Sequence, residues 1–228
     1  MRAPINARLK TLATLIRDGA VLADVGTDHA YLAIYMLSEG RITFAHLSDI
    51  NEEPLNRARR NVSLYSFSDR VDFHLTNGAR DLAGLGITDY AIAGMGGELI
   101  ADIIDSAPQL RSEKVNLALQ PMTKPEILRA YLYDNGFDII NEKYVADEGK
   151  KYVCMRACYV GSPVPYTPAD IHFGKECFAD KENSGWRDYM SEQYSRLQSV
   201  IRGKKLGALS TELEDELIKA LSKRLGIS

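Results

Sequence analysis

The sequence has little cysteine, no long apolar run and no excess of positive charge, and each shortage argues against a class of protein. Three cysteines occur among 228 residues, and so small an odd number does not make a disulfide framework. No apolar run approaches the roughly 20 residues needed to span a bilayer. The first 19 residues carry basic side chains between their leucines, unlike the apolar core of a signal peptide. We therefore expect a cytoplasmic protein without a membrane partner.

The sequence also lacks a recognisable metal-binding motif. Cys154 and Cys158 lie in a strand-like segment, but no second cysteine pair completes a zinc site, so we expect both to be small core residues. His46 and His74 fall on separate predicted strands, and neither shows ligand spacing with His29. We predict no metal.

The formal net charge of −3 argues against a protein that coats nucleic acid. Basic residues nevertheless cluster within residues 1–20 and again around 202–205, and local patches of this kind can attract a polyanion. Charge alone supports an ordinary solvated surface equally well. If the partner is a nucleic acid, the candidates for phosphate contacts are Arg8, Lys10, Arg202, Lys204 and Lys205.

Apolar strand-like runs alternate with segments of helical periodicity through the first 136 residues. Strands are predicted at 21–25, 43–49, 70–76, 89–94 and 115–120, and helices at 5–17, at 29–37, from 51, at 98–107 and at 125–136. Such alternation predicts an α/β fold with a parallel sheet that carries helices on both faces.

The pattern changes after residue 136. Two strand-like runs, 137–144 and 151–160, are joined by a short polar loop with no helix, which predicts a hairpin whose last strand is antiparallel. A seven-stranded Rossmann-like sheet with one antiparallel hairpin strand is typical of class I S-adenosylmethionine-dependent methyltransferases. This likeness concerns the fold and does not assign a function.

A second unit is predicted after residue 162. Three prolines within 163–170 indicate a linker. Apolar residues spaced three or four apart then predict a helix over 186–201, a turn at 203–207 and a final helix that begins at a capping box, Thr211 to Glu214. We expect a methyltransferase-like domain over 1–162, followed over 163–228 by a linker and an antiparallel coiled-coil hairpin.

The loop after the first strand resembles a dinucleotide fingerprint without its later glycines. It retains Gly26, but Asp28 and Ala30 stand where pyrophosphate needs space and a neutral surface. A carboxylate here suits a cofactor that carries an ammonium and a sulfonium group, such as S-adenosylmethionine. Alternatively, Asp28 caps the following helix. Asp24 and His29 belong to the same predicted cofactor loop, and His29 has a backbone-capping role as its alternative.

Two further strand ends extend the predicted cofactor site. Asp49 ends the second strand, where a carboxylate can accept hydrogen bonds from ribose hydroxyls, and Ile50 follows it. Asn77 and Gly78 follow the third strand, where an amide can bond the adenine amino group, although a plain turn is nearly as well supported.

The fourth strand ends in Gly94-Met95-Gly96-Gly97, an open loop whose backbone can approach a flat base. The Asn/Asp-Pro-Pro-aromatic segment used to methylate exocyclic amines is absent, which disfavours that chemistry. A ring nitrogen with its own lone pair needs no general base, so positioning can supply most of the rate. The alternative is a tight strand-to-helix turn, which accounts for one or two of these glycines better than for three.

Two more side chains are candidates for substrate contacts. Gln120 ends the fifth strand and could hydrogen-bond a base, and Tyr152 could stack on one. A structural role is the stronger reading for each. The sequence offers no secure general base, and Asp28 is the nearest candidate for a catalytic carboxylate.

Several motifs together resemble the bacterial TrmK family of tRNA adenine-N1 methyltransferases, which act at position 22. They are DVGTDHAYL (24–32), SDINEEPL (48–55), AGMGG (93–97), LALQP (117–121) and the combination NGF…EGKKY (135–152). The resemblance covers roughly residues 5–160 in matching order, and the C-terminal hairpin matches in pattern only. One departure is Asn77-Gly78-Ala79 where Gly-Asp-Gly is expected, although Asn can still bond adenine.

The resemblance implies S-adenosylmethionine as methyl donor, full-length tRNA as substrate and no metal. We separately expect a monomer or weak dimer. It implies cofactor contacts from Gly26, Asp28, His29, Asp49 and the 77–78 loop, with 94–97 beside the methyl-transfer site. Two other hypotheses stay open. One is a small-molecule methyltransferase with a dimerising hairpin, and the other is a binding module with a decayed cofactor site.

Overall fold

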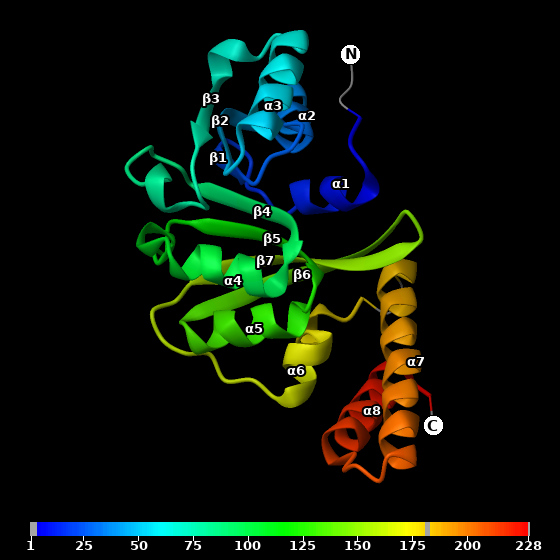
Figure 1. Ribbon diagram of the computed structural model, residues 1–228. Helices are drawn as coiled ribbons and strands as arrows, with labels where there is room; N and C mark the ends of the chain where they lie inside the picture. The colour runs from blue at the N-terminus through cyan, green and yellow to red at the C-terminus, as the bar shows by residue number, and fades with distance from the viewer. Residues whose placement is uncertain (1–3, 181–182, 228) are drawn as a thin grey trace.

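The computed structural model describes residues 4–180 and 183–227 and contains one seven-stranded sheet (Figure 1). The strand order is β3-β2-β1-β4-β5-β7-β6, in which β7 runs antiparallel to both β5 and β6 and the other paired neighbours are parallel. The predicted sheet and its hairpin are thus confirmed. The strands are β1 (Ala20–Val25), β2 (Ile42–Asp49), β3 (Val71–Leu75), β4 (Asp89–Gly96), β5 (Asn116–Thr123), β6 (Phe137–Asp147) and β7 (Lys150–Tyr159).

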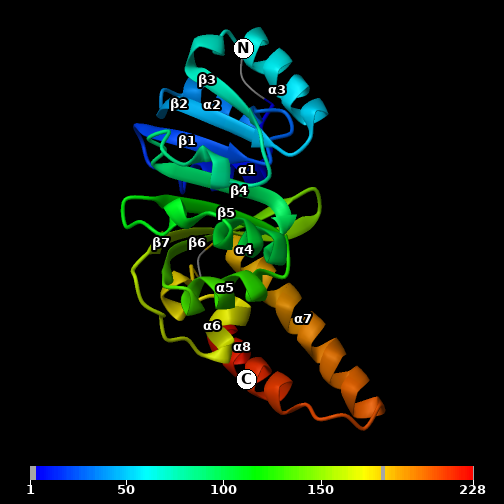
Figure 2. The same ribbon diagram turned by 60° about the vertical axis from the view of Figure 1, so that its left-hand side comes forward.

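Helices cover both faces of the sheet, as Figures 1 and 2 show. The helices are α1 (Ala7–Ala13), α2 (Tyr31–Ser38), α3 (Glu52–Leu64), α4 (Gly97–Asp105) and α5 (Pro125–Asp134). Side chains of α1, α2 and α3 share one buried cluster with Leu22 and Ala91, whereas those of α4 and α5 share another with Ala23 and Ile92. Adjacent strand residues therefore face opposite layers, as expected for a sheet buried on both sides.

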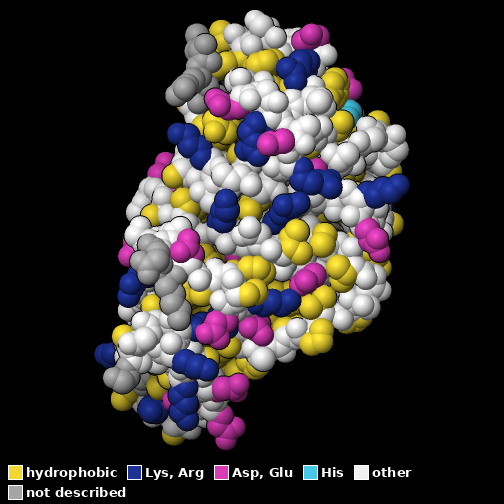
Figure 3. All heavy atoms as spheres, turned by 180° about the vertical axis from the view of Figure 1, so that it is seen from behind, with side chains coloured by type: hydrophobic (Ala, Val, Ile, Leu, Met, Phe, Trp, Pro, Cys, Tyr) yellow, Lys and Arg dark blue, Asp and Glu magenta, His cyan; other side chains and the backbone are white. Residues whose placement is uncertain are grey.

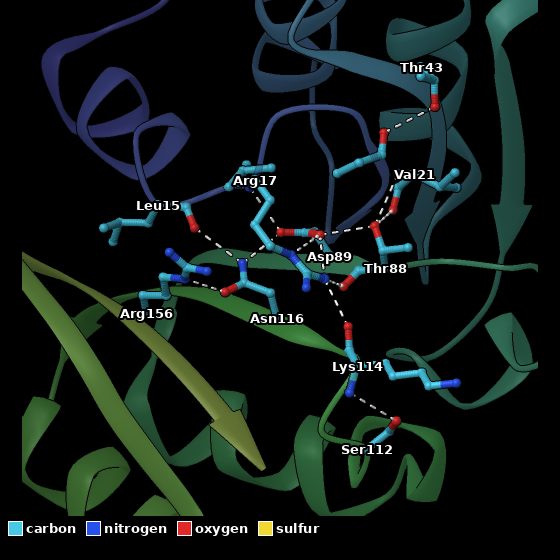
Figure 4. A network of polar contacts seen from close by, with 12 residues as sticks. Leu15, Arg17, Val21, Thr43, Thr88, Asp89, Ser112, Lys114, Asn116 and Arg156 are labelled. Atoms are coloured by element: carbon cyan, nitrogen blue, oxygen red, sulfur yellow. Dashed lines mark hydrogen bonds and ion pairs between the residues drawn. The ribbon is translucent and has the colours of Figure 1, made fainter. Parts of the chain in front are cut away.

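Helix α1 is shorter than the predicted helix 5–17, because the residues that follow Ala13 take part in a polar network instead (Figure 4). The Arg17 guanidinium forms an ion pair with the fully buried Asp89 carboxylate at the start of β4, and its Nη2 lies 2.9 Å from Asp89 Oδ2. The Asn116 side chain on β5 donates to Asp89 and to the carbonyl of Leu15. The chain after α1 is thereby fixed to the amino-terminal edge of the sheet.

The C-terminal segment forms α6 (Pro168–Phe173), α7 (Ser184–Leu206) and α8 (Glu212–Leu225). Helices α7 and α8 pack against each other as predicted. The predicted linker, however, already becomes helical at Pro168, where Thr167 and Asp170 form a capping box. The capping box predicted at Thr211 is wrong, because the Thr211 hydroxyl donates to Asp215 and Glu214 pairs with Lys204.

A buried ion pair joins this segment to the sheet. Arg129 on α5 and Glu142 on β6 have fully buried side chains, with Arg129 Nε 2.6 Å from Glu142 Oε1. Arg129 also donates to the carbonyl of Ile171 in α6, and the Tyr144 hydroxyl donates to Glu142. Side chains of α6, α7 and α8 belong to the same buried cluster as α4 and α5. The C-terminal helices are therefore packed on the sheet domain through a common core.

Replacing Glu142 by Gln should destabilise the protein by about 3–5 kcal/mol, because it leaves the buried Arg129 charge without its anion. Urea unfolding of the full-length chain measures the loss. Glu98→Gln is the matched control, since Glu98 forms an ion pair of the same length, 2.6 Å, with Lys124 while 55% exposed. That change should cost at most about 1 kcal/mol. Equal losses in the two variants would contradict the role assigned to the buried pair.

Candidate functional site

The loop after β1 is held against the end of β2 by main-chain hydrogen bonds. The amides of Gly26 and Thr27 both donate to the carbonyl of Ser48, at 2.8 and 2.9 Å. Gly26 has φ +76°, a left-handed conformation that favours glycine, and an added Cβ would lie 2.0 Å from Met95 Cε. The folded loop therefore favours glycine at position 26 whether or not a ligand binds.

A cavity of about 340 Å³ opens beside this loop. Asp24, Gly26 and the residues through Leu32 form one wall, Arg8 and Leu9 of α1 form another, and Ala93 and Gly94 of β4 complete the lining. It lies at the carboxyl ends of β1 and β4, where open α/β sheets bind ligands.

Asp24 gives this cavity a buried carboxyl group. The Thr27 hydroxyl donates to Asp24 Oδ2 at 2.9 Å, and among the described residues no cationic side chain forms an ion pair with it. Burial raises the pKa of Asp24 from 3.8 to about 6, and the hydrogen bond from Thr27 only partly opposes this. A positively charged ligand in the cavity would stabilise the ionised form.

Asp28 is less available than the sequence indicates. Its carboxylate accepts two hydrogen bonds from Arg57 on α3 and lies 3.1 Å from His29 Nε2. The alternative capping role is wrong, since α2 begins after Ala30 without a side-chain cap. Arg57 and Asn61, which donates to the carbonyl of His29, were not identified from the sequence. Their spacing of four on α3 was the available signal, because it places both on the face toward this loop.

The predicted ribose and adenine residues lie at neighbouring strand ends. One Asp49 oxygen accepts a hydrogen bond from the amide of Asn51, which leaves the other oxygen for other donors. The neighbouring Ile50 side chain is exposed. Asn77 and Gly78 line a separate hollow of about 520 Å³ between the β3 loop and α4. Gly78 has φ +74°, a left-handed conformation, so the turn at this position favours glycine whether or not a ligand binds.

Glycine is present at different positions of the 94–97 segment for different structural reasons. Gly94 has φ +79°, and a Cβ on Gly97 would lie 2.3 Å from the carbonyl oxygen of Lys124. Gly96 is extended and meets only Thr123 Oγ1, at 3.3 Å. The strand-to-helix turn thus explains Gly94 and Gly97, in agreement with the alternative that a tight turn accounts for one or two of the glycines. It leaves Gly96 unexplained. Met95 extends its side chain over Gly26.

Gln120 is fully buried and already engaged on both ends of its amide. Its oxygen accepts from Arg8 Nη1 and from the amide of Gly94, while its nitrogen donates to the carbonyl of Pro121. Arg8 Nε also lies 4.0 Å from Asp147 Oδ2, and Arg8 Cζ lies 5.9 Å from the centre of the Tyr152 ring. Arg8 therefore connects α1 to the ends of β4 and β5 and to the β6–β7 hairpin.

The other candidates for phosphate contacts lie on the surface. Lys10, Arg202 and Lys205 are exposed, whereas Lys204 is half-buried and forms a 2.6 Å ion pair with Glu214. Figure 3 shows Lys and Arg side chains spread over one face of the sheet domain, with both signs of charge at the end formed by α7 and α8. The structure thus separates Arg8, in the cavity, from the four others.

Comparison with known proteins relates this geometry to a family. A family model described as a methyltransferase domain matches residues 5–155. The chain is 27% identical over 224 residues to the tRNA (adenine(22)-N(1))-methyltransferase of Bacillus subtilis, covering 97% of this chain and 94% of that one.

Two solved structures are similar along nearly the whole chain. The B. subtilis m1A22 tRNA methyltransferase TrmK aligns with a TM-score of 0.79 and 26% identity, covering 98% of this chain and 97% of that one. A Streptococcus pneumoniae protein solved in complex with S-adenosyl-L-methionine aligns with a TM-score of 0.83 and 28% identity, covering 97% and 99%. No helix among the described residues is long and apolar enough to cross a membrane.

Replacing Asp24 by Asn should stabilise the protein near neutral pH. Because the folded-state pKa is raised from 3.8 to about 6, the ionised carboxylate costs stability, fully above about pH 6 and not at all below about pH 4. A shift of about two units corresponds to at most about 3 kcal/mol. Urea unfolding at about pH 7.5 and pH 4 measures the difference. The control Asp188→Asn, at an exposed position on α7, should leave the free energy of unfolding unchanged at both pH values. A gain of the same size at both pH values would contradict the assignment.

Proposed function

Since this chain belongs to the methyltransferase domain family, we propose that it methylates N1 of adenine 22 in tRNA with S-adenosylmethionine. The supporting observation is the likeness to the B. subtilis tRNA (adenine(22)-N(1))-methyltransferase over 97% of the chain, because it includes the C-terminal helices as well as the sheet domain. The cavity at the carboxyl ends of β1 and β4 provides the place for the reaction.

The residues of the cavity fit a cationic cofactor. Asp24 is a buried carboxyl group without a cationic partner among the described residues, and the ammonium and sulfonium groups of S-adenosylmethionine would supply the missing charge. Gly26 leaves room for the end of the Met95 side chain, which lies against the loop. In this proposal Asp49 accepts hydrogen bonds from the ribose hydroxyls, and Asn77, beside Gly78, bonds the adenine amino group. When bound, the cofactor supplies an activated methyl group.

The chain's own contribution to the reaction is positioning. Adenine N1 carries a lone pair, so the protein need not remove a proton before attack, and correct placement can supply most of the rate. The Gln120 side-chain oxygen accepts from the amide of Gly94 and also from Arg8 Nη1, so Arg8 holds Gln120 in place. Arg8 therefore acts as a positioning residue, which sets the shape of the cavity wall that faces the base.

The tRNA backbone requires contacts outside the cavity. Lys10 on α1 and Arg202 and Lys205 on α7 are exposed cations suited to phosphates. Lys204 can take part only by exchanging its ion pair with Glu214 for one with a phosphate. A tRNA substrate is also in keeping with a cytoplasmic location.

Unmodified tRNA should gain one methyl group at adenine 22, and tRNA with another base at that position should gain none. Transfer of labelled methyl from S-adenosylmethionine, followed by mapping of the modified base, measures this. Gly26→Ala should lower transfer, because the new methyl group displaces the end of the Met95 side chain in the cavity wall. Gly19→Ala is the matched control, since Gly19 has a similar φ of +78° with nothing within 4 Å of an added Cβ. Equal labelling of both tRNAs would overturn the assignment of position 22.

Arg8→Gln and Lys10→Gln should affect different kinetic constants. We expect Arg8→Gln to lower kcat by roughly tenfold or more, because the cavity wall loses its support. Lys10→Gln should leave kcat unchanged, weaken tRNA binding and reduce the slope of log Kd against log salt by about one. If Arg8→Gln altered only tRNA affinity and its salt dependence, Arg8 would be a phosphate contact instead.

A further inference from the structure

Three side chains with metal-ligand chemistry meet on one face of the sheet, away from the cavity. In the parallel register of β2 and β3, His46 pairs with Asp72 and Ser48 with His74. Ala45, Leu47 and Val71 face the cluster of buried residues that includes α2 and α3, so the three side chains point to the opposite face. One ligand atom from each of His46, Asp72 and His74 lies within 4.8 Å of the others.

The distances between these atoms suit a single metal ion. His46 Nδ1 lies 3.1 Å from His74 Nε2. An ion about 2.05 Å from both nitrogens, the usual zinc–imidazole distance, would make an N–metal–N angle of about 98°. That angle lies between the octahedral and tetrahedral values. Asp72 Oδ2 is 3.9 Å from His46 Nδ1, and its side chain is 63% exposed, so it can rotate inward.

The His46 imidazole is held in place before any ion arrives. His46 is 5% exposed, packs against the ring of Phe44 and hydrogen-bonds the backbone of Leu85. Support of a ring from main chain is typical of histidines that bind metals.

We propose that His46, Asp72 and His74 form a binding site for a divalent transition metal such as Zn²⁺. Without metal, one proton lies between His46 Nδ1 and His74 Nε2; on binding it moves to His74 Nδ1, and the two facing nitrogens and an Asp72 oxygen coordinate the ion. Water completes the coordination. The ion would join the edge strand β3 to β2, just before the loop at Asn77 and Gly78. The site goes beyond the methylation reaction and does not depend on it.

Calorimetric titration of ZnCl₂ into the full-length, untagged chain tests the proposal. A Cys177→Ser background removes the exposed thiol that would otherwise compete for zinc. We expect saturable binding of one Zn²⁺ and a rise in the unfolding temperature, because the ion binds only the folded arrangement. His74→Gln and Asp72→Asn change side chains that are not fully buried, so they avoid the folding risk of replacing His46. His74→Gln should weaken binding roughly tenfold or more.

His172→Gln is the control, because it removes a half-buried histidine on α6. It should bind Zn²⁺ as the parent does. The proposal is overturned if no saturable binding occurs, which would leave the two imidazoles joined only by a hydrogen bond. It is equally overturned if binding survives in a chain carrying both His74→Gln and Asp72→Asn, or is lost in His172→Gln. Methylation activity need not be measured in any of these outcomes.

Discussion

The Asp89 carboxylate, fully buried at the start of β4, is the constraint on which the geometry of the cavity depends. A buried charge of this kind is tolerated only with full hydrogen bonding, and Arg17, Thr88 and Asn116 provide it. Because Arg17 and the carbonyl of Leu15 are held here, α1 is anchored at the amino-terminal edge of the sheet. Its other end reaches the carboxyl edge, where Arg8 meets Gln120. One short helix thus spans the sheet, and its anchoring determines where a cavity wall lies.

Two carboxyl groups four residues apart have opposite environments, and this changes the electrostatic argument for the cofactor. Sequence reasoning relied on Asp28, but Asp28 is exposed and already paired with Arg57. Asp24 is buried with its pKa raised to about 6, so it gains most from a cationic ligand. The energy stored by burying Asp24 is available to ligand binding, at a cost to the stability of the unliganded protein. Asp28 in turn holds α3 to the loop through Arg57.

Local patterns predicted the strands and the β6–β7 hairpin because these follow from periodicity within a segment. The same patterns were poor at segment ends, because several local hydrogen bonds compete there: Thr167 caps α6 through Asp170, whereas Thr211 donates to Asp215 instead of capping α8. Side-chain contacts between strands could not be predicted from the sequence. His46 and His74 have no useful spacing along the chain, and only the register of β2 with β3 brings them together. Arg8 was one basic residue among several in the sequence, and only the anchoring of α1 places it beside Gln120.

The arrangement of the elements lets a protein of net charge −3 present exposed cations on particular helices. Helix α1, the tip of the β6–β7 hairpin and α7 lie along the side of the molecule where β4 and β5 end (Figures 1 and 2). Lys10 on α1 and Arg202 and Lys205 on α7 are exposed cations, so the net charge of −3 does not describe the local charge of these helices. Phosphate contacts fix orientation without reading sequence, so recognition of the base is left to the cavity. The buried pair of Arg129 and Glu142 then has a functional consequence, because it keeps α6, and through the shared core α7, in a constant position relative to the cavity.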